Sequence, residues 1–245
     1  MRQQPMRLRP ELVAIVYRIV YDAGPEPGVI YHSESDFDEV TRGILSQHVE
    51  DTDFWLFAYG SLIWKPEIEH SEERMATVHG WRRSFCLKAN RWRGTIDQPG
   101  LVMMLDRGGQ CKGVVFRIDR NRVAEGLGKL VRREMDAKPP SQVPRWITAA
   151  TQKGKVKALA FVSNPKGPDY AGGLTIEQLA DRLSIACGHW GSGADYLYNT
   201  VHSLQNRGIH DSYLWRLQSL VADRIVATSE HQETTKDTSL LRRLP

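Results

Sequence analysis

An aromatic run leads into Tyr59-Gly60-Ser61-Leu62, the first stretch of the chain with groups suited to binding or catalysis. Residues 54–58 read Phe-Trp-Leu-Phe-Ala, which predicts a buried strand. A glycine and a serine directly after a strand place consecutive backbone N–H groups at a sharp turn, which can hold a carboxylate or a developing oxyanion. The same sequence also fits an ordinary turn in which Gly60 only supplies an unusual φ.

Glu134 is the second candidate, because it follows Arg132 and Arg133 at the end of a helix predicted over 123–135. Apolar surroundings would raise the pKa of this carboxyl above its usual value of about 4.3 and make it a general base. A solvated helix end is the alternative. We expect both arginine side chains to point away from Glu134, since a nearby guanidinium would lower its basicity. Glu125 is a candidate second carboxylate, with a solvated helix residue as the alternative.

The common catalytic motifs are absent from the sequence. It contains no P-loop, no Gly-x-Ser-x-Gly, and no Gly-x-Gly-x-x-Gly after a strand, since 188–193 has a different glycine spacing. The three cysteines, Cys86, Cys111 and Cys187, form no Cys-x-x-Cys pair, and no His-x-x-x-His pair lies on a helix. His189 is interpreted as a loop histidine. These patterns do not favour a disulfide scaffold or a zinc ribbon.

A basic stretch offers a competing interpretation. Aromatic residues alternate with five cations in it: Arg82, Arg83, Lys88, Arg91 and Arg93. Such a pattern is compatible with a groove for single-stranded nucleic acid, with a solvated strand face, or with a small-anion site. The net charge of +4 is small for 245 residues, and it does not favour a nucleic-acid binder.

Elements that would position these groups follow from periodicity and turn residues. Strands are predicted at 54–59, 75–80, 85–88, 101–105, 113–118, 145–150 and 156–162, and helices at 123–135, 175–186, 194–207 and 211–225. This order indicates an α+β fold with a mixed sheet or small barrel. Residues 1–50 are predicted as a helical extension with Ser35 as a helix cap, 51–227 as the main domain, and 228–245 as a frayed tail. The apolar segment 12–21 is too short to span a membrane, which needs about 20 apolar residues.

Taken in order, the motifs of residues 55–223 resemble those of the ChaC-type γ-glutamylcyclotransferases that act on glutathione, most closely the bacterial branch. The matching segments are Tyr59-Gly60-Ser61-Leu62-Ile63-Trp64-Lys65-Pro66, Gly80-Trp81-Arg82-Arg83-Ser84-Phe85, Arg93-Gly94, Pro99-Gly100, Gly113-Val114-Val115-Phe116, Arg132-Arg133-Glu134-Met135, Pro144-Arg145-Trp146, Pro168-Asp169-Tyr170 and Gly188…Gly191…Tyr196-Leu197. The ordered set, rather than any one motif, carries the resemblance.

The resemblance implies a small mixed β-barrel with flanking helices. It implies release of 5-oxoproline and Cys-Gly from glutathione without metal or cofactor. By the same resemblance, residues 59–62 hold the γ-glutamyl group, Glu134 is the catalytic acid/base, and Tyr170 contacts substrate. Tyr170 and Tyr196 match family positions, although each is also compatible with a packed aromatic residue.

This chemistry explains the missing motifs, because the nucleophile belongs to the substrate. The α-amine attacks the γ-carbonyl of the same residue, and such intramolecular attack reaches effective molarities of about 10⁵–10⁸ M. One glutamate can take the proton of the attacking amine and return it to the departing one. Backbone N–H groups of Gly60 and Ser61 are the expected donors to the oxyanion.

Two departures from the family pattern bear on substrate preference. Ala58 replaces a glycine, and residues 138–142 replace a loop with glycine and tyrosine, so that Gln142 stands at the tyrosine position. Cyclisation of other γ-glutamyl amines or peptides therefore stays open beside glutathione, as does a noncatalytic binding module. We expect a cytoplasmic protein with a small-molecule substrate, binding neither nucleic acid nor membrane. The sequence makes no prediction of oligomeric state.

Overall fold

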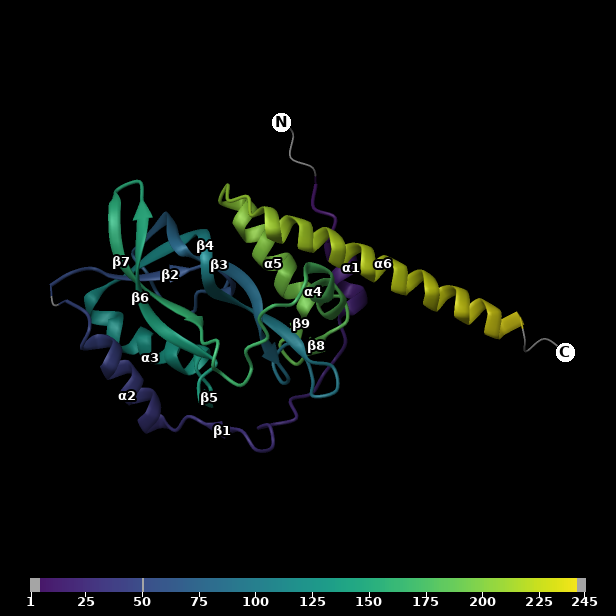
Figure 1. Ribbon diagram of the computed structural model, residues 1–245, viewed down its shortest axis with the longest axis horizontal. Coiled ribbons are helices and arrows are strands. Elements are labelled where there is room, and N and C mark those ends of the chain that lie inside the picture. Colours follow the sequence, from purple (N-terminus) through teal and green to yellow (C-terminus); the bar gives the residue numbers. More distant parts are fainter. Residues whose placement is uncertain (1–4, 50, 242–245) are drawn as a thin grey trace.

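A closed barrel of five strands forms the centre of the computed structural model, which describes residues 5–49 and 51–241, with backbone only from 232 onward. The strands are β2 (Phe54–Ala58), β3 (Glu72–Ala89), β4 (Gly100–Ile118), β6 (Gln142–Thr151) and β7 (Gly154–Ser163), in the order β2-β4-β3-β6-β7. Strand β7 closes the barrel by pairing in parallel with β2 and, at Leu105 and Val162, with β4, while the remaining pairings of the barrel are antiparallel (Figure 1). The α+β class and the small mixed barrel are confirmed.

The β3–β4 hairpin corrects the predicted strand list. The segments 75–80 and 85–88 belong to one strand, and so do 101–105 and 113–118. Gly80, the last residue of the predicted strand 75–80, sits at a bulge in β3 with a φ of 78°, where the register shifts between His79 and Trp81. A glycine within a strand often marks such a bulge, so local composition alone divided a continuous strand.

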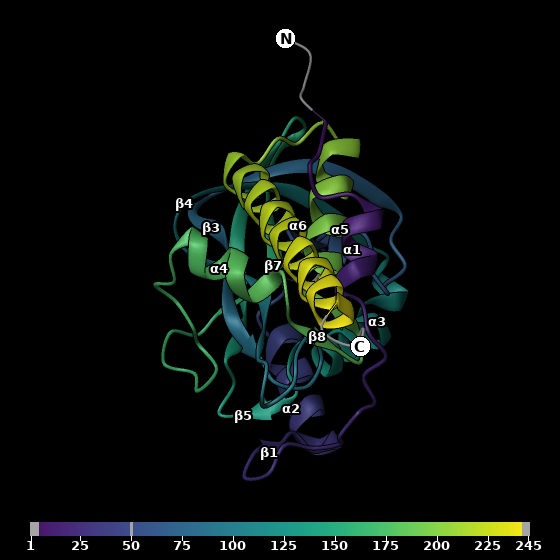
Figure 2. The same ribbon diagram turned by 90° about the vertical axis from the view of Figure 1, so that its right-hand side faces the viewer.

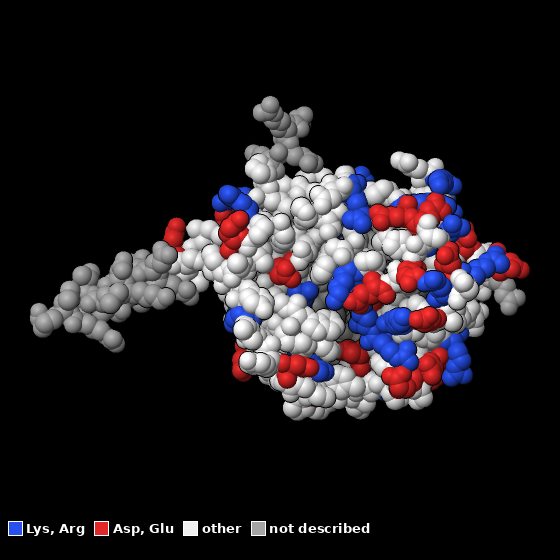
Figure 3. All heavy atoms as spheres, turned by 180° about the vertical axis from the view of Figure 1, so that it is seen from behind, with Lys and Arg blue, Asp and Glu red and all other residues white. Residues whose placement is uncertain are grey.

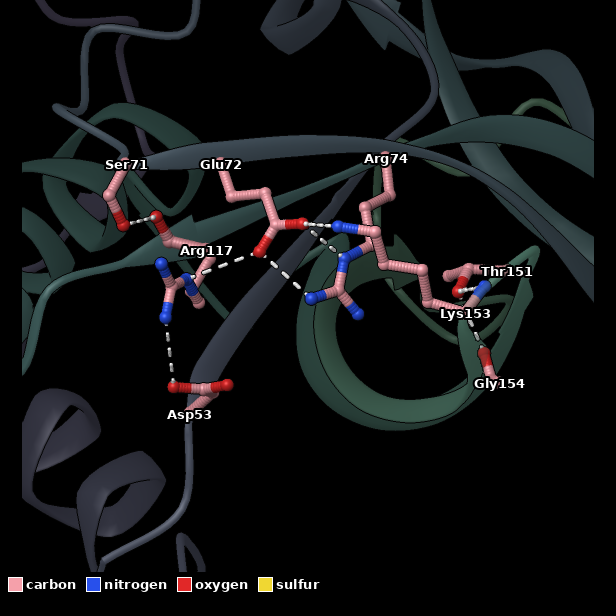
Figure 4. Close-up of polar contacts among 8 residues, drawn as sticks. All are labelled: Asp53, Ser71, Glu72, Arg74, Arg117, Thr151, Lys153 and Gly154. Atoms are coloured by element: carbon pink, nitrogen blue, oxygen red, sulfur yellow. Dashed lines mark hydrogen bonds and ion pairs between the residues drawn. The ribbon is translucent and has the colours of Figure 1, made fainter.

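Charged side chains connect the beginning of β3, the end of β4 and the β6–β7 turn (Figure 4). Glu72 on β3 accepts hydrogen bonds from Arg74 at 2.8 Å and from Lys153 of the β6–β7 turn at 2.7 Å. Arg117 on β4 lies 3.5 Å from Glu72 and 3.6 Å from Asp53. The Arg74 hydrogen bond is the main cause that lowers the pKa of Glu72 to about 2.

Helices cover the barrel on two sides. They are α3 (Val123–Glu134), α4 (Ile176–Leu183), α5 (Gly193–Asn206) and α6 (Ser212–Leu241), with one 3₁₀ turn at Ser61–Ile63 and another at Arg120–Arg122. Short two-stranded pairs join β1 (Ile30–Tyr31) to β5 (Ala137–Lys138) and β8 (Cys187–Gly188) to β9 (Gly191–Ser192). No helix in the described part of the chain is long and apolar enough to cross a membrane.

Helix α6 contradicts the predicted frayed tail over 228–245. It continues to Leu241 and projects from the body of the molecule (Figures 1 and 2). Residues 226–241 contain no glycine or proline, so no residue of strong helix-breaking character ends the helix there. Polarity without periodicity indicated missing tertiary contacts, but it did not exclude a helix. Residues 242–245 of the predicted tail lie outside the described residues.

The N-terminal extension is only partly helical. Helix α1 (Pro10–Val16) packs against α5 and α6, and α2 (Glu34–Leu45) packs against α3. An extended segment joins these helices and includes β1 (Figure 1). Ser33, not the predicted Ser35, caps α2, because its side chain accepts the Asp36 N–H at 3.3 Å. Residues 1–4 and 50 of the predicted extension lie outside the described residues.

Candidate active site

A cavity of about 720 Å³ lies among the barrel, the end of α3, the start of α5 and the N-terminal extended segment, within the range of about 300–1,000 Å³ usual for small-molecule sites. Its lining includes Ser61, Glu134 and Tyr196, which come from three separate elements. The structure therefore brings a residue of the 59–62 motif and the predicted acid into one hollow.

The Tyr59–Leu62 motif contributes unequally to this cavity. In the described lining only Ser61 of the four residues appears. The Tyr59 hydroxyl donates to the Phe161 carbonyl at 2.7 Å inside the barrel, and Leu62 is buried. Gly60 has an ordinary φ of −129°, so the interpretation through an unusual φ is wrong. A Cβ there would stand 3.0 Å from the Tyr196 hydroxyl, so the absent side chain permits a close approach.

Tyr196 meets the motif from α5. Its hydroxyl accepts the Ser61 N–H at 3.3 Å, and its ring packs edge-on against Trp64 and Phe85. Burial is the main cause that raises the pKa of the Tyr196 hydroxyl, so it stays protonated. The sequence is compatible with Tyr196 either as a substrate contact or as a packed aromatic residue. Its match in the ordered motif set was the only sequence signal for it.

Glu134 occupies the last position of α3. Val123, Leu127, Leu130 and Val131 of this helix are buried and dock it on the barrel. Burial raises the pKa of the Glu134 carboxyl, opposed by the Arg133 charge and assisted by that of Glu67. A carboxylate at a helix C-terminus also faces the negative end of the helix dipole, which disfavours its charged form further.

Arg133 overturns part of the expectation for the two arginines. Its Nε lies 3.2 Å from Glu134 Oε1, and its Nη2 donates to Ser61 Oγ at 2.9 Å, so one guanidinium bridges the serine and the glutamate. The reason is that Arg133 is anchored toward the Ser61 turn, where it also pairs with Glu67 at 3.1 Å. Arg132 does point away, toward Glu34.

The remaining predicted site residues lie elsewhere. Tyr170 is not among the described residues that line the cavity. Its backbone forms an isolated antiparallel β-bridge with Leu87, and its hydroxyl donates a hydrogen bond to Asp106 at 3.3 Å. Glu125 is exposed and pairs with Lys129 at 2.6 Å, so the solvated interpretation is confirmed. Gln142 does line the cavity, together with its loop neighbours Pro140 and Ser141.

The histidines and cysteines show no catalytic arrangement in the described residues. No group of His, Cys, Asp and Glu there could hold a metal ion. His189 contacts the Arg91 carbonyl through Nδ1 at 2.9 Å and packs against Trp92, consistent with a structural loop residue. All three cysteines are buried and unpaired.

Comparison with known proteins agrees with this architecture. The family model described as ChaC-like protein matches residues 54–224. A glutathione-specific gamma-glutamylcyclotransferase of Escherichia coli strain K12 is 34% identical over 161 residues, which are 65% of this chain and 69% of that protein. The Homo sapiens glutathione-specific gamma-glutamylcyclotransferase 1 is 32% identical over 158 residues, which are 62% of this chain and 69% of that protein. The crystal structure of a yeast gamma-glutamylcyclotransferase specific to glutathione superposes with a TM-score of 0.63 at 18% identity, covering 71% of this chain and 100% of the yeast chain, and shows the shared fold.

Proposed function

The chain belongs to the ChaC-like protein family, and we propose that it degrades glutathione as a γ-glutamylcyclotransferase, with residues 51–227 as the catalytic domain. The E. coli and human relatives carry this activity in their names. One observation in the structure supports it most strongly: Glu134 lies partly buried in the same cavity as Ser61, and one guanidinium contacts both side chains. A proton-transfer group thus lies beside the family's motif.

The reaction breaks the amide between the γ-carboxyl group and cysteine. The substrate's α-amine attacks the γ-carbonyl carbon, and its proton passes to the Glu134 carboxylate. The carbonyl oxygen becomes an oxyanion in the tetrahedral intermediate. When the C–N bond to cysteine breaks, Glu134 returns the proton to the departing amine, so that 5-oxoproline and Cys-Gly leave and the enzyme is unchanged.

A raised pKa suits Glu134 for both halves of this transfer. A carboxylate of ordinary pKa is a weak base toward an ammonium group, and burial strengthens it. Arg133 limits the effect, because its charge favours the ionised carboxylate. We infer that burial makes Glu134 more basic than an exposed glutamate and that the Arg133 charge moderates this rise of the pKa.

The backbone N–H groups of Gly60 and Ser61 were the expected donors to the oxyanion, and the structure offers further candidates. The Ser61 N–H already donates to the Tyr196 hydroxyl, so it is engaged before substrate enters. We propose that the Tyr196 O–H and the Arg133 guanidinium stabilise the oxyanion, since both lie at Ser61 and carry polar hydrogens. Tyr59, Gly60 and Leu62 then shape the turn that presents Ser61.

The direct test is incubation of the purified full chain with glutathione and no added metal, followed by assay of 5-oxoproline. Stoichiometric 5-oxoproline and Cys-Gly are expected, and addition of a metal chelator should not change the rate. Absence of 5-oxoproline from glutathione would contradict the proposal.

A second candidate is the same cyclisation on other γ-glutamyl amines or peptides. The loop 138–142 departs from the family pattern, and its residues Pro140, Ser141 and Gln142 line the cavity. Assaying γ-glutamyl amino acids beside glutathione separates the two, because a higher kcat/KM for any of them would reassign the substrate.

The binding-module alternative loses its main support in the structure. Four of the five cations of the basic stretch are ion-paired: Arg82 with Asp106 at 3.3 Å, Arg83 with Asp211 at 2.9 Å, Arg91 with Asp22 at 2.7 Å and Arg93 with Asp195 at 2.9 Å. Acidic and basic side chains are also interspersed over the barrel half of the face in Figure 3. Filter binding to RNA at two salt concentrations tests this alternative.

A cytoplasmic location is also proposed, because unpaired cysteines and a thiol substrate suit a reducing compartment.

A further inference from the structure

Residues 17–33, named the strap here, run along the cavity from outside the segment that the family model matches. The strap begins after α1, contains β1 near its end, and leads into α2 (Figures 1 and 2). At one end Asp22 accepts two hydrogen bonds from Arg91, each 2.7 Å long. At the other end β1 pairs with β5, and the His32 N–H donates to the Asp136 carbonyl at 2.9 Å.

The middle of the strap forms part of the cavity lining through Glu26, Val29 and Tyr31. The Glu26 N–H donates to the Tyr31 hydroxyl at 2.8 Å, which braces this turn. The Glu26 carboxylate accepts a hydrogen bond from Asn90 at 2.8 Å, directly after β3. The strap therefore closes the cavity beside the end of β3, and its acidic group is already engaged there.

Lys88, near the end of β3, differs from the other cations of the lining. The others are paired: Lys65 with Glu67 at 2.9 Å, Arg93 with Asp195 at 2.9 Å, Arg132 with Glu34, and Arg133 with Glu67 at 3.1 Å and with Glu134 at 3.2 Å. The Lys88 ammonium makes no hydrogen bond or ion pair with any residue that the structure describes, although the residue is partly buried. Its backbone is fixed, since its N–H donates to the Asp169 carbonyl at 2.8 Å.

An unpaired cation in a partly enclosed cavity is suited to a ligand anion. If the γ-glutamyl group lies at Ser61 and Glu134, the two remaining residues of the substrate extend about 7 Å further. Their last group is a carboxylate. The Ser61 end already contains the Arg133 guanidinium, whereas the strap-covered end of β3 offers Lys88.

We propose that Lys88 binds the terminal carboxylate of the leaving dipeptide and that the strap closes this subsite. The inference rests on the proposed function and assigns the preference for a free terminal carboxylate to one residue. Substrates that lack this charge would lose the contact, while the chemistry at Glu134 would be unaffected.

The experiment compares glutathione with its C-terminal carboxamide, which has the same shape without the terminal charge. The wild-type chain should have a KM for glutathione about tenfold lower than for the amide, as one charge-assisted hydrogen bond provides. Lys88→Met should raise the KM for glutathione to that of the amide and leave kcat within about twofold. The control Lys155→Met changes an exposed lysine on β7 outside the described cavity lining and should alter neither constant.

Binding without turnover provides a second readout. Titration calorimetry of both compounds against Glu134→Gln, with and without Lys88→Met, should show the same loss of preference for the acid. Equal weakening of both compounds by Lys88→Met, or no change in glutathione binding, would overturn the role of Lys88. If the wild-type chain binds glutathione and prefers the acid through Lys88 but releases no 5-oxoproline, the proposed reaction fails and the subsite stands.

Discussion

The hydroxyl of Tyr196 offers a sharp test of the site, because phenylalanine fills the same space against Phe85 and Trp64. In Tyr196→Phe the Ser61 N–H loses its acceptor at 3.3 Å. A fully buried group left unsatisfied costs about 1–3 kcal/mol of folding free energy, and this partly buried N–H costs less. The reaction also loses one donor to the oxyanion, which lowers kcat by about 10²–10³-fold.

Tyr170→Phe is the matched control, since it removes the same atom from a tyrosine that bonds Asp106 outside the described cavity lining. Release of 5-oxoproline at saturating glutathione gives kcat, and urea unfolding gives stability. Tyr196→Phe should lose kcat while staying folded, and Tyr170→Phe should keep it. Near wild-type kcat in Tyr196→Phe, or an equal loss in Tyr170→Phe, would refute the assignment of the donor.

Three further variants test other contacts. Arg133→Met removes the charge that lowers the pKa of Glu134. The pKa of Glu134 should therefore rise, and the acidic limb of the pH profile of kcat/KM should move to higher pH. An acidic limb that does not move would contradict the contact between Arg133 and Glu134. Leu127→Ala empties a fully buried position on α3 and should lower the free energy of unfolding by about 2–5 kcal/mol in urea titration, while a loss below 1 kcal/mol would argue against this packing. Asp22→Ala removes the hydrogen bonds of the strap to Arg91. Limited proteolysis within residues 17–33 should then be faster, and the KM for glutathione should rise by a larger factor than kcat falls. An unchanged rate of proteolysis would show that this ion pair does not hold the strap in place.

Local patterns predicted β2 and α3 well, because the buried positions of both elements coincide with their apolar residues. The run 54–58 is buried throughout, and the apolar positions of 123–134 form the docking face of one helix. Glu134 could be placed at the end of that helix for the same reason. The sequence could not predict that the Glu134 side chain lies in the cavity, since that depends on how α3 packs against the turn after β2.

Long-range contacts account for most of what the sequence did not predict. Tyr196 approaches Gly60 from a helix more than a hundred residues later, and Arg133 turns toward Ser61 instead of solvent. The strap has no sequence periodicity from which its path could be predicted. Its position depends on the contact of Asp22 with Arg91 and on the pairing of β1 with β5. For Tyr170 a motif match indicated a substrate contact, which stays a prediction, and no sequence signal indicated that its hydroxyl donates to Asp106.

The central claim is that one partly buried carboxylate, Glu134, moves the proton while the substrate cyclises. The most direct measurement is the rate of 5-oxoproline release from glutathione by Glu134→Gln, compared with Glu125→Gln on the exposed face of the same helix. Glutamine keeps the size of the side chain but cannot accept the proton, so Glu134→Gln should lose about 10²–10⁴-fold in kcat with an unchanged circular dichroism spectrum, and Glu125→Gln should retain full activity. A folded Glu134→Gln that turns over glutathione at close to the wild-type rate would contradict the claim.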